Sequence, residues 1–190
     1  MNNVRYLIAD AEMGGRELHF SLLTSFFMVM DEDFKVLGEL DLKTKPDDGI
    51  YILSGQGMTV NGINIQEHDK IAIPYKQAKP LLYDFLKRMA QGKHLVPVGH
   101  GIRGDISHFQ KYLISEGSWE QYCSYHYIDT GVVLQYLRAC SKLPYDTDGS
   151  VGALASYFNI DVDKNVLHTA RYDTGLIAEV FQKMVELGKN

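Results

Sequence analysis

The pattern of apolar and polar residues in the first part of the chain predicts strands. Residues 6–9 form a short apolar run that ends at Asp10, as expected of a buried strand that delivers polar residues to the edge of a sheet. Residues 22–30 and 34–42 are two further strand-like runs, and the acidic segment 31–33 between them suits a tight turn. The pattern therefore predicts one buried strand followed by a β-hairpin.

The rest of the chain alternates between helical and strand-like segments. Apolar residues recur at helical spacing from Pro80 towards Gly92, and again from Leu176 to Val185 in a long amphipathic helix that ends near Gly188. Other predicted elements are a loop over 46–57, strands over 95–98 and 125–128, and helices over 106–115, 131–139 and 154–158. A hairpin followed by β/α alternation is typical of an α/β fold with a mixed sheet. No repeat or low-complexity segment divides residues 1–190, so we expect a single domain.

Composition is that of an ordinary globular protein. The chain has 190 residues, of which 45% are hydrophobic and 23% charged, and this excludes the disordered and fibrous classes. The longest apolar stretch, residues 20–30, is interrupted by polar residues and is shorter than the roughly 18 residues that cross a bilayer. No secretory leader is visible, so a cytoplasmic location is expected. Cys123 and Cys140 lack C-x-x-C spacing and are expected to be reduced thiols in the core.

The charge balance narrows the class of partner. Nineteen basic residues against 24 acidic ones give a formal charge of −5, and no dense run of lysine and arginine marks a strong duplex-DNA binder. A nucleic-acid enzyme remains compatible with this balance, because carboxylates gathered around divalent cations present much less negative charge to a phosphate. The positions of the carboxylates are therefore decisive.

Four carboxylates and one histidine stand near the ends of predicted elements. Asp10 and Glu12 flank one residue at the end of the first strand, so their side chains point to the same side. Asp105 follows a strand and a glycine-bearing turn, whereas His168 and Asp173 open the last helix. Five helical steps separate two side chains by about 140°, so the last two converge only if His168 precedes the regular helix. Taken singly, each motif is also explained as a solvated strand end or as an acid at a helix N-terminus.

In chain order, these residues resemble the DEDD superfamily of 3′→5′ exonucleases. The histidine at 168 is similar to that of the DEDDh branch, because the tyrosine branch would have tyrosine at 169, where this chain has threonine. Three further segments resemble the family: residues 10–15 the opening motif of oligoribonucleases, residues 58–63 the segment before the second helix of proofreading exonucleases, and residues 154–160 the short helix before the histidine motif.

One position departs from the family pattern. An asparagine commonly follows the Gly-His or Ala-His of the second motif, and Gly101 stands there after His100. The side-chain contacts of that turn are therefore expected to differ, while the four carboxylates are all present.

The resemblance implies an RNase H-like fold and 3′→5′ hydrolysis of single-stranded DNA or short RNA to nucleoside monophosphates. It implies that two Mg²⁺ or Mn²⁺ ions are held by Asp10, Glu12, Asp105 and Asp173, with Asp10 touching both ions. Hard oxygen ligands suit these cations, and a pair of cations is a recurring device for phosphodiester hydrolysis. His168 would be the general base for the attacking water, because imidazole titrates near neutral pH.

The resemblance also suggests how a substrate is held. Met13 and Gly14 are similar to the family segment beneath the terminal nucleotide, where a glycine permits close approach of the backbone. The alternative is that Gly14 and Gly15 only form a turn. The implied partner is a single strand with a free 3′ end, and a homodimer or a polymerase or repair partner is a further expectation. No membrane partner is expected.

Several residues and rival functions stay open at this level. Tyr157 and Phe158 could stack on bases, although helical aromatics more often pack in the core. Trp119 is expected to pack, and the six histidines other than His168 have no spacing that suggests a role. The rivals are a catalytically silent nucleic-acid-binding or recruiting module on the same fold and a carboxylate-metal phosphatase. DNA and RNA are not distinguished, since recognition of the 2′-hydroxyl depends on local geometry.

Overall fold

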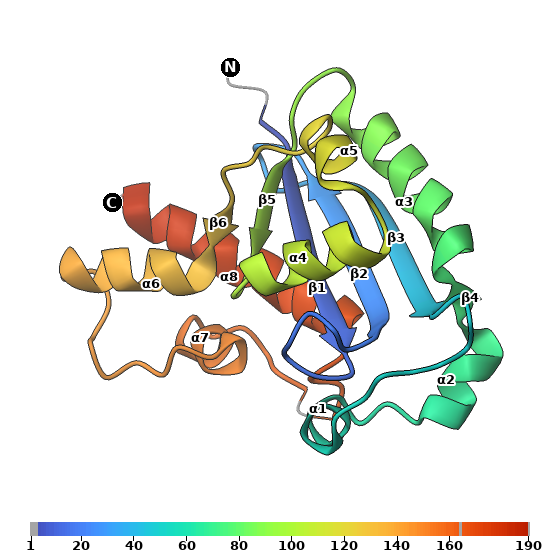
Figure 1. Ribbon diagram of the computed structural model, residues 1–190. Helices are drawn as coiled ribbons and strands as arrows, with labels where there is room; N and C mark the ends of the chain where they lie inside the picture. The colour runs from blue at the N-terminus through green and yellow to red at the C-terminus, as the bar shows by residue number, and fades with distance from the viewer. Residues whose placement is uncertain (1–3, 164, 190) are drawn as a thin grey trace.

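The computed structural model describes residues 4–163 and 165–189, which form a mixed sheet with helices on both faces (Figure 1). Its strands are β1 (Tyr6–Met13), β2 (Leu22–Met30), β3 (Val36–Lys45), β4 (Ile73–Pro74), β5 (Val96–Gly99) and β6 (Ile128–Asp129). They lie in the order β4-β3-β2-β1-β5-β6. β1, β2 and β3 are antiparallel neighbours, whereas β5 runs parallel to β1, β6 to β5 and β4 to β3. The predicted α/β fold with a mixed sheet is confirmed.

Eight helices occur in the described part of the chain. They are α1 (Gly55–Asn61), α2 (Ile65–Ile71), α3 (Tyr75–Ala90), α4 (Arg103–Tyr112), α5 (Glu116–Glu120), α6 (Thr130–Ala139), α7 (Val151–Tyr157) and α8 (Ala170–Lys189). The helices α3, α4 and α5 cover one face of the sheet, and α8 covers the other, with α6 and α7 packed beside it (Figure 1). None of the helices in the described residues combines the length and the apolar character needed to cross a membrane.

Alternation along β1 decides which face receives the carboxylates. Leu7 and Ala9 point into the core beneath α3 and α4, whereas Ile8 packs on the α8 side. Successive side chains of a strand point to opposite faces, so Asp10 and Glu12 follow Ile8 onto the α8 side. The strand therefore delivers both carboxylates to the face on which α8 begins.

Parallel strands bring further residues to the same edge of the sheet. β1, β5 and β6 run in the same direction and end at one edge, where α4 starts soon after β5 and α6 directly after β6. Ligands of open α/β sheets bind outside this carboxyl edge. A functional site is therefore expected at this edge of the sheet.

Aromatic packing secures the α4 side of the sheet. The rings of Phe27 and Phe109 lie 4.8 Å apart between centroids, and Trp119 lies 6.1 Å from Phe109. All three side chains are buried, which confirms the packing role expected of Trp119. This cluster fixes α4, whose first turn carries Asp105, against the sheet.

Several predicted boundaries are wrong for identifiable reasons. α3 begins at Tyr75 and contains Pro80 in its second turn, because the buried face of the helix already includes Tyr75 and Ala78. That packing outweighs the one backbone hydrogen bond that the proline cannot donate. β6 covers only Ile128 and Asp129, because β5 offers it only two pairing positions.

Other differences concern exposure and short helices. α1 and α2 lie partly or wholly where no helix was predicted, and both are short helices capped by the side chain before them, Ser54 and Asn64. Cys123 is buried as expected, but the prediction of a core thiol is wrong for Cys140, which ends α6 and is exposed. Tyr157, the last residue of α7, is also exposed.

A close backbone contact joins α1 to the segment that follows β1. A Cβ atom added at Gly57 would lie 2.5 Å from the carbonyl oxygen of Gly14, and the N–H of Ser54 donates to that same oxygen at 2.6 Å. Only a residue without a side chain fits at Gly57. The approach of α1 therefore depends on this glycine.

We expect Gly57→Ala to lower the free energy of unfolding by about 1–3 kcal/mol, because the added methyl group must displace backbone. Gly55→Ala is the matched control, since it lies in the same helix and its added Cβ would meet nothing within 4 Å. That control should be neutral or stabilising by up to about 1 kcal/mol. Urea denaturation of both variants measures the difference, and equal effects would contradict the contact.

Candidate active site

Three carboxylates from opposite ends of the chain meet at the carboxyl edge of the sheet. Asp10 and Glu12 come from β1, and Asp173 comes from the first turn of α8. One oxygen of each lies within 4.8 Å of the others, and all three residues are half-buried. This spacing suits the ligands of one cation.

Asp105, in the first turn of α4, is the fourth member of what we call the carboxylate quartet: Asp10, Glu12, Asp105 and Asp173. Asp105 is only 7% exposed. It stands outside the group of three that share the 4.8 Å spacing, but its charge acts on Asp10 and Glu12. Asp105 therefore belongs to the same electrostatic group, although it lies outside the three closest carboxylates.

Burial favours the protonated form of every carboxyl in the quartet, and repulsion from the other members adds to this at Asp10 and Glu12. Burial raises the pKa of Asp10 well above its ordinary value, and the charges of the other three carboxylates raise it further. Burial, followed by the charges of Asp173 and Asp105, raises the pKa of Glu12 to about 8. Burial raises the pKa of Asp105 to about 8 and that of Asp173 to a smaller extent. The quartet is therefore stable in the folded protein only when protons or cations neutralise part of its charge.

The oxygen atoms present fit a hard divalent cation. Oδ1 of Asp173 is buried and has no hydrogen-bond partner among the described residues. An orphaned buried carboxylate oxygen is costly unless a ligand satisfies it. The three clustered groups are all carboxylates, the donor class that Mg²⁺ and Mn²⁺ prefer.

His168 lies before the regular helix, which is the condition under which it converges with Asp173. Its φ of 63° is left-handed, and its backbone N–H donates to Oδ2 of Asp173 at 3.2 Å. The next residue, Thr169, donates its hydroxyl to the carbonyl of Val166 at 2.9 Å. His168 and Glu12 line a common cavity of about 490 Å³. The histidine is therefore exposed to solvent beside the acidic cluster.

A second cavity of about 280 Å³ opens on the other side of Glu12, and we call it the terminal cavity. Met13 and Gly15 line it from the end of β1, and Val60 and Asn61 line it from α1. Gly14 lies behind this lining: a Cβ added there would come within 2.7 Å of the carbonyl of Ile52. The close approach that Gly14 permits is therefore to the protein's own backbone.

Hydrogen bonds hold the wall of the terminal cavity in place. Nδ2 of Asn61 donates to the carbonyl of Met13 at 3.0 Å, and the hydroxyl of Ser54 donates to that of Gly14 at 2.9 Å. The N–H of Gly14 donates to the carbonyl of Ser21 in turn. These bonds fix α1 against the end of β1.

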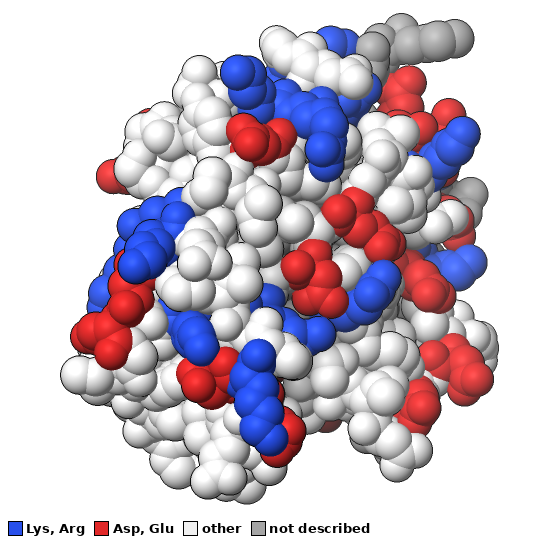
Figure 2. Space-filling model, turned by 90° about the vertical axis from the view of Figure 1, so that its right-hand side faces the viewer, with Lys and Arg blue, Asp and Glu red and all other residues white. Residues whose placement is uncertain are grey.

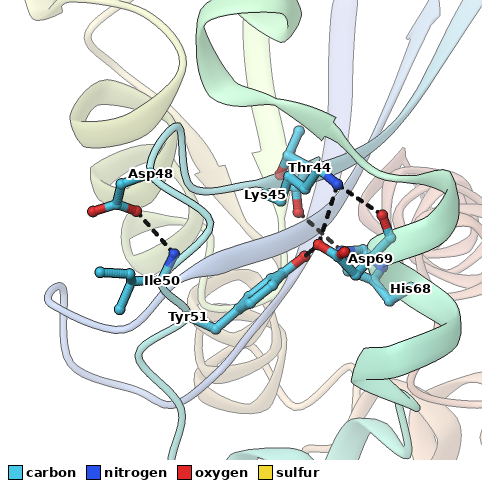
Figure 3. Close-up of polar contacts among 7 residues, drawn as sticks. All are labelled: Thr44, Lys45, Asp48, Ile50, Tyr51, His68 and Asp69. Atoms are coloured by element: carbon cyan, nitrogen blue, oxygen red, sulfur yellow. Dashed lines mark hydrogen bonds and ion pairs between the residues drawn. The ribbon is translucent and has the colours of Figure 1, made fainter.

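A polar clamp on α2 secures the loop that leads to this wall (Figure 3). Lys45 donates to the carboxylate of Asp69 at 3.1 Å, and the hydroxyl of Tyr51 donates to the same oxygen at 2.9 Å. These two bonds hold the pKa of Asp69 below its ordinary value. His68 is hydrogen-bonded through Nε2 to the carbonyl of Thr44 at 2.9 Å. The loop that continues to Ser54 is thus tied to the end of β3.

The end of β6 adds residues that the sequence analysis did not select. Asp129 accepts the N–H of Gly131 at 2.8 Å and thereby caps α6, and its charge acts on the pKa of Asp105. Thr130 lies 2.9 Å from Nδ1 of His100, whose pKa is lowered by burial. β6 is only two residues long, so the local pattern of apolar residues does not mark where it ends. Asp129 and Thr130 could have been selected only from their place at the end of a strand parallel to β5.

Gly101 suits the turn between β5 and α4. Its φ is 70°, a conformation that other residues rarely adopt. Gly101, at the position where the resemblance predicted an asparagine, is therefore the residue type that this left-handed turn favours.

Charges away from the site are interleaved on the face turned to the viewer in Figure 2, on the side of α3 and the outer edge of the sheet. Basic and acidic side chains alternate there and form no broad patch of one sign (Figure 2). This face offers no electrostatic footprint for a duplex.

No protein-family model and no curated sequence matches the chain. Solved structures do match. E. coli exonuclease I in complex with a dA16 oligonucleotide has a TM-score of 0.75 and 17% identity, covering 96% of this chain and 41% of that chain. The zinc-bound form of an E. coli ExoI–single-stranded DNA complex has a TM-score of 0.72 and 17% identity, covering 95% and 40%.

A full-length 3′-exonuclease matches with a TM-score of 0.70 and 16% identity, covering 99% of this chain and 62% of that chain. The chain thus spans about two fifths of the exonuclease I chains. At this level of identity the matches establish the fold. The chain has the RNase H-like α/β fold of these exonuclease structures, as the resemblance to DEDDh exonucleases predicted.

Proposed function

We propose that residues 1–190 act as one exonuclease domain that removes nucleoside monophosphates from the 3′ end of single-stranded DNA or short RNA. The observation that carries the proposal is the meeting of Asp10, Glu12 and Asp173 beside a cavity of about 280 Å³. The fold shared with exonuclease structures supports it. The substrate is a single strand with a free 3′ end.

The quartet would hold two Mg²⁺ or Mn²⁺ ions. Asp10 would touch both ions, as the resemblance implies; it clusters with Glu12 and Asp173, and the charge of Asp105 acts on it as well. When bound, such ions offset the charge of the phosphate and of the leaving oxygen. The protein's own part is to hold these partly buried carboxylates close together.

His168 would accept the proton of the attacking water. Its backbone N–H is held by Asp173, so the segment that carries the imidazole is fixed relative to the quartet. The side chain stands in a solvent-filled cavity that Glu12 also lines, where a water can reach both. A proton taken there can leave to solvent.

Met13 would contact the terminal nucleotide, and Gly14 would position it. The terminal cavity lies next to Glu12, so a nucleotide in it would present its phosphate to the quartet. Gly14 would position the nucleotide indirectly, because the absence of a side chain there lets the backbone behind the cavity pack closely against Ile52.

The direct test is a 5′-labelled single strand incubated with Mn²⁺, next to a 3′-blocked strand, a circular strand and a generic phosphate ester. We expect a stepwise ladder from the free 3′ end, survival of the blocked and circular strands, and no activity in excess chelator. Turnover of the ester alone would favour a phosphatase, and binding without any turnover would favour a silent module.

The metal-free protein should lose stability as pH rises from about 4 to about 8. Glu12 and Asp105 hold protons when folded at pH values where the unfolded chain has released them, so the folded state binds more protons in this window. The loss should amount to a few kcal/mol, roughly, across the window. Urea denaturation in excess chelator at a series of pH values measures it.

The control for this pH dependence is Glu12→Gln combined with Asp105→Asn, in which the fall should be much smaller. Added Mn²⁺ should stabilise the wild-type protein more at pH 8 than at pH 5, because the cation replaces protons that are then absent. Stability that rises with pH in the metal-free wild type, relative to the double variant, would contradict the pKa shifts.

Asp10→Asn should be the most damaging single substitution. It removes charge from the carboxylate that is proposed to touch both ions, so the rate should fall at least roughly a hundredfold. Asp146→Asn and Asp161→Asn are the controls, because both residues lie in loops and neither belongs to the quartet. Their single-turnover rates should stay near wild type; equal losses at all three positions would refute the special role of Asp10.

His168→Ala should separate proton transfer from metal binding. We expect the variant to bind Mn²⁺ and single-stranded oligonucleotide, to melt near the wild-type temperature and to turn over roughly 10²–10⁴-fold more slowly. Asp173→Asn should instead weaken Mn²⁺ binding itself. Calorimetric titration and single-turnover rates at saturating metal decide between these outcomes. A wild-type rate in His168→Ala would remove its assignment as general base.

A further inference from the structure

A cavity of about 440 Å³ lies at the end of α6 that is remote from the quartet. α6 begins at Thr130, which contacts His100 beside the active-site edge, and runs for ten residues, about 15 Å. The cavity is formed where α6 ends, by the segment that joins it to α7 and by Tyr157, the last residue of α7. In Figure 1 both helices lie on the α8 side of the sheet, joined by this segment. We call it the α6–α7 cavity.

The lining of the α6–α7 cavity is basic and aromatic. Arg138 and Lys142 supply two positive charges, Tyr145 and Tyr157 supply two aromatic rings, and none of the described residues that line it is acidic. A lining with positive charges alone differs from the chain as a whole, which has a formal charge of −5, and from the face in Figure 2, where charges of both signs are interleaved. Phosphates and bases together are the ligands that such a lining complements.

The two tyrosines of the α6–α7 cavity present their rings to solvent. Tyr145 is 74% exposed and Tyr157 is 44% exposed. Pro144 precedes Tyr145 and restricts the backbone there, so the ring is presented from a stiff segment. Rings held in this way stack on bases of any sequence at little entropic cost.

Arg138 holds the rim of the cavity. Its guanidinium donates to the carbonyl of Thr147 and, at 3.3 Å, to the side chain of Gln135. Its buried Nε has no partner among the described residues. The segment between the helices is therefore tied to α6, while the side chain of Lys142 is exposed at the rim, where it can meet a phosphate.

We propose that the α6–α7 cavity binds the part of a single-stranded substrate that lies several nucleotides upstream of the 3′ end. Lys142 and Arg138 contact the backbone phosphates, and Tyr145 and Tyr157 stack on bases. This inference rests on the proposed exonuclease function, because it places the 3′-terminal nucleotide in the terminal cavity. A strand too short to span α6 gains nothing from the second site.

The test compares a dinucleotide with a strand of about sixteen nucleotides as substrates of Lys142→Glu/Tyr145→Ala. We expect KM for the long strand to rise at least about fivefold, with kcat unchanged and with KM for the dinucleotide unchanged. The dependence of log KM on log salt should also become shallower by about 0.7 for each phosphate that the variant no longer neutralises. Equal KM changes for both substrates, or no change for the long strand, would overturn the proposal.

Lys79→Glu/Tyr125→Ala is the matched control. It makes the same chemical changes at exposed residues in α3 and before β6, on elements that do not line the cavity. Its KM for both substrates should equal that of the wild type, and melting temperatures check that both double variants are folded. An effect in the control as large as in the test variant would mean that it reflects general charge and would overturn the subsite.

Failure of the proposed function can be told apart from failure of this inference. If the wild type degrades neither substrate, fluorescence anisotropy with a labelled strand of about sixteen nucleotides still measures binding. Weaker binding of this strand by Lys142→Glu/Tyr145→Ala than by the control supports the subsite. Equal Kd values for the two variants overturn it, whatever the wild type hydrolyses.

Discussion

The partial burial of four carboxylates at one edge of the sheet, with repulsion among them, is the constraint on which the rest of the site depends. Asp10, Glu12 and Asp173 lie within 4.8 Å of one another, and Asp105 adds its charge from α4. A folded chain tolerates such a group only if protons or cations neutralise it. The raised pKa values of Glu12 and Asp105 express that demand in the metal-free protein. The stability and the proposed chemistry are therefore coupled through the same four groups.

The scaffold meets this constraint by holding the carboxylates on rigid elements. β1 is flanked by β2 and β5, and the first turns of α4 and α8 are fixed by cores on opposite faces of the sheet. Around the terminal cavity, backbone contacts at Gly14 and Gly57 and the hydrogen bond of Asn61 replace side-chain packing. The bonds of Lys45 and Tyr51 to Asp69 also fix α2 to the end of β3 and to the loop after it (Figure 3). A site built in this way is preorganised for one geometry.

The sequence predicted those features that follow from local periodicity. The two-residue spacing of Asp10 and Glu12 placed both on one face, and the amphipathic pattern placed α8 and hence Asp173. α1 escaped prediction because its seven residues include two glycines, and its stability comes from the Ser54 cap and the contact with Gly14. The role of Asp129 could not be predicted, because it depends on the order of the strands in the sheet, which local sequence patterns do not reveal. The exposure of Tyr157 depends on how α7 packs against α8, which is also a long-range property.

The proposed function requires the quartet to be a divalent-cation site. Anomalous scattering from a crystal of the wild-type protein soaked in Mn²⁺ tests it most directly, because manganese is located without any assumption about activity. We expect a strong peak among the carboxylates of Asp10, Glu12 and Asp173, and no such peak in Asp10→Asn. Manganese peaks only elsewhere on the surface, with the quartet empty at saturating Mn²⁺, would contradict it.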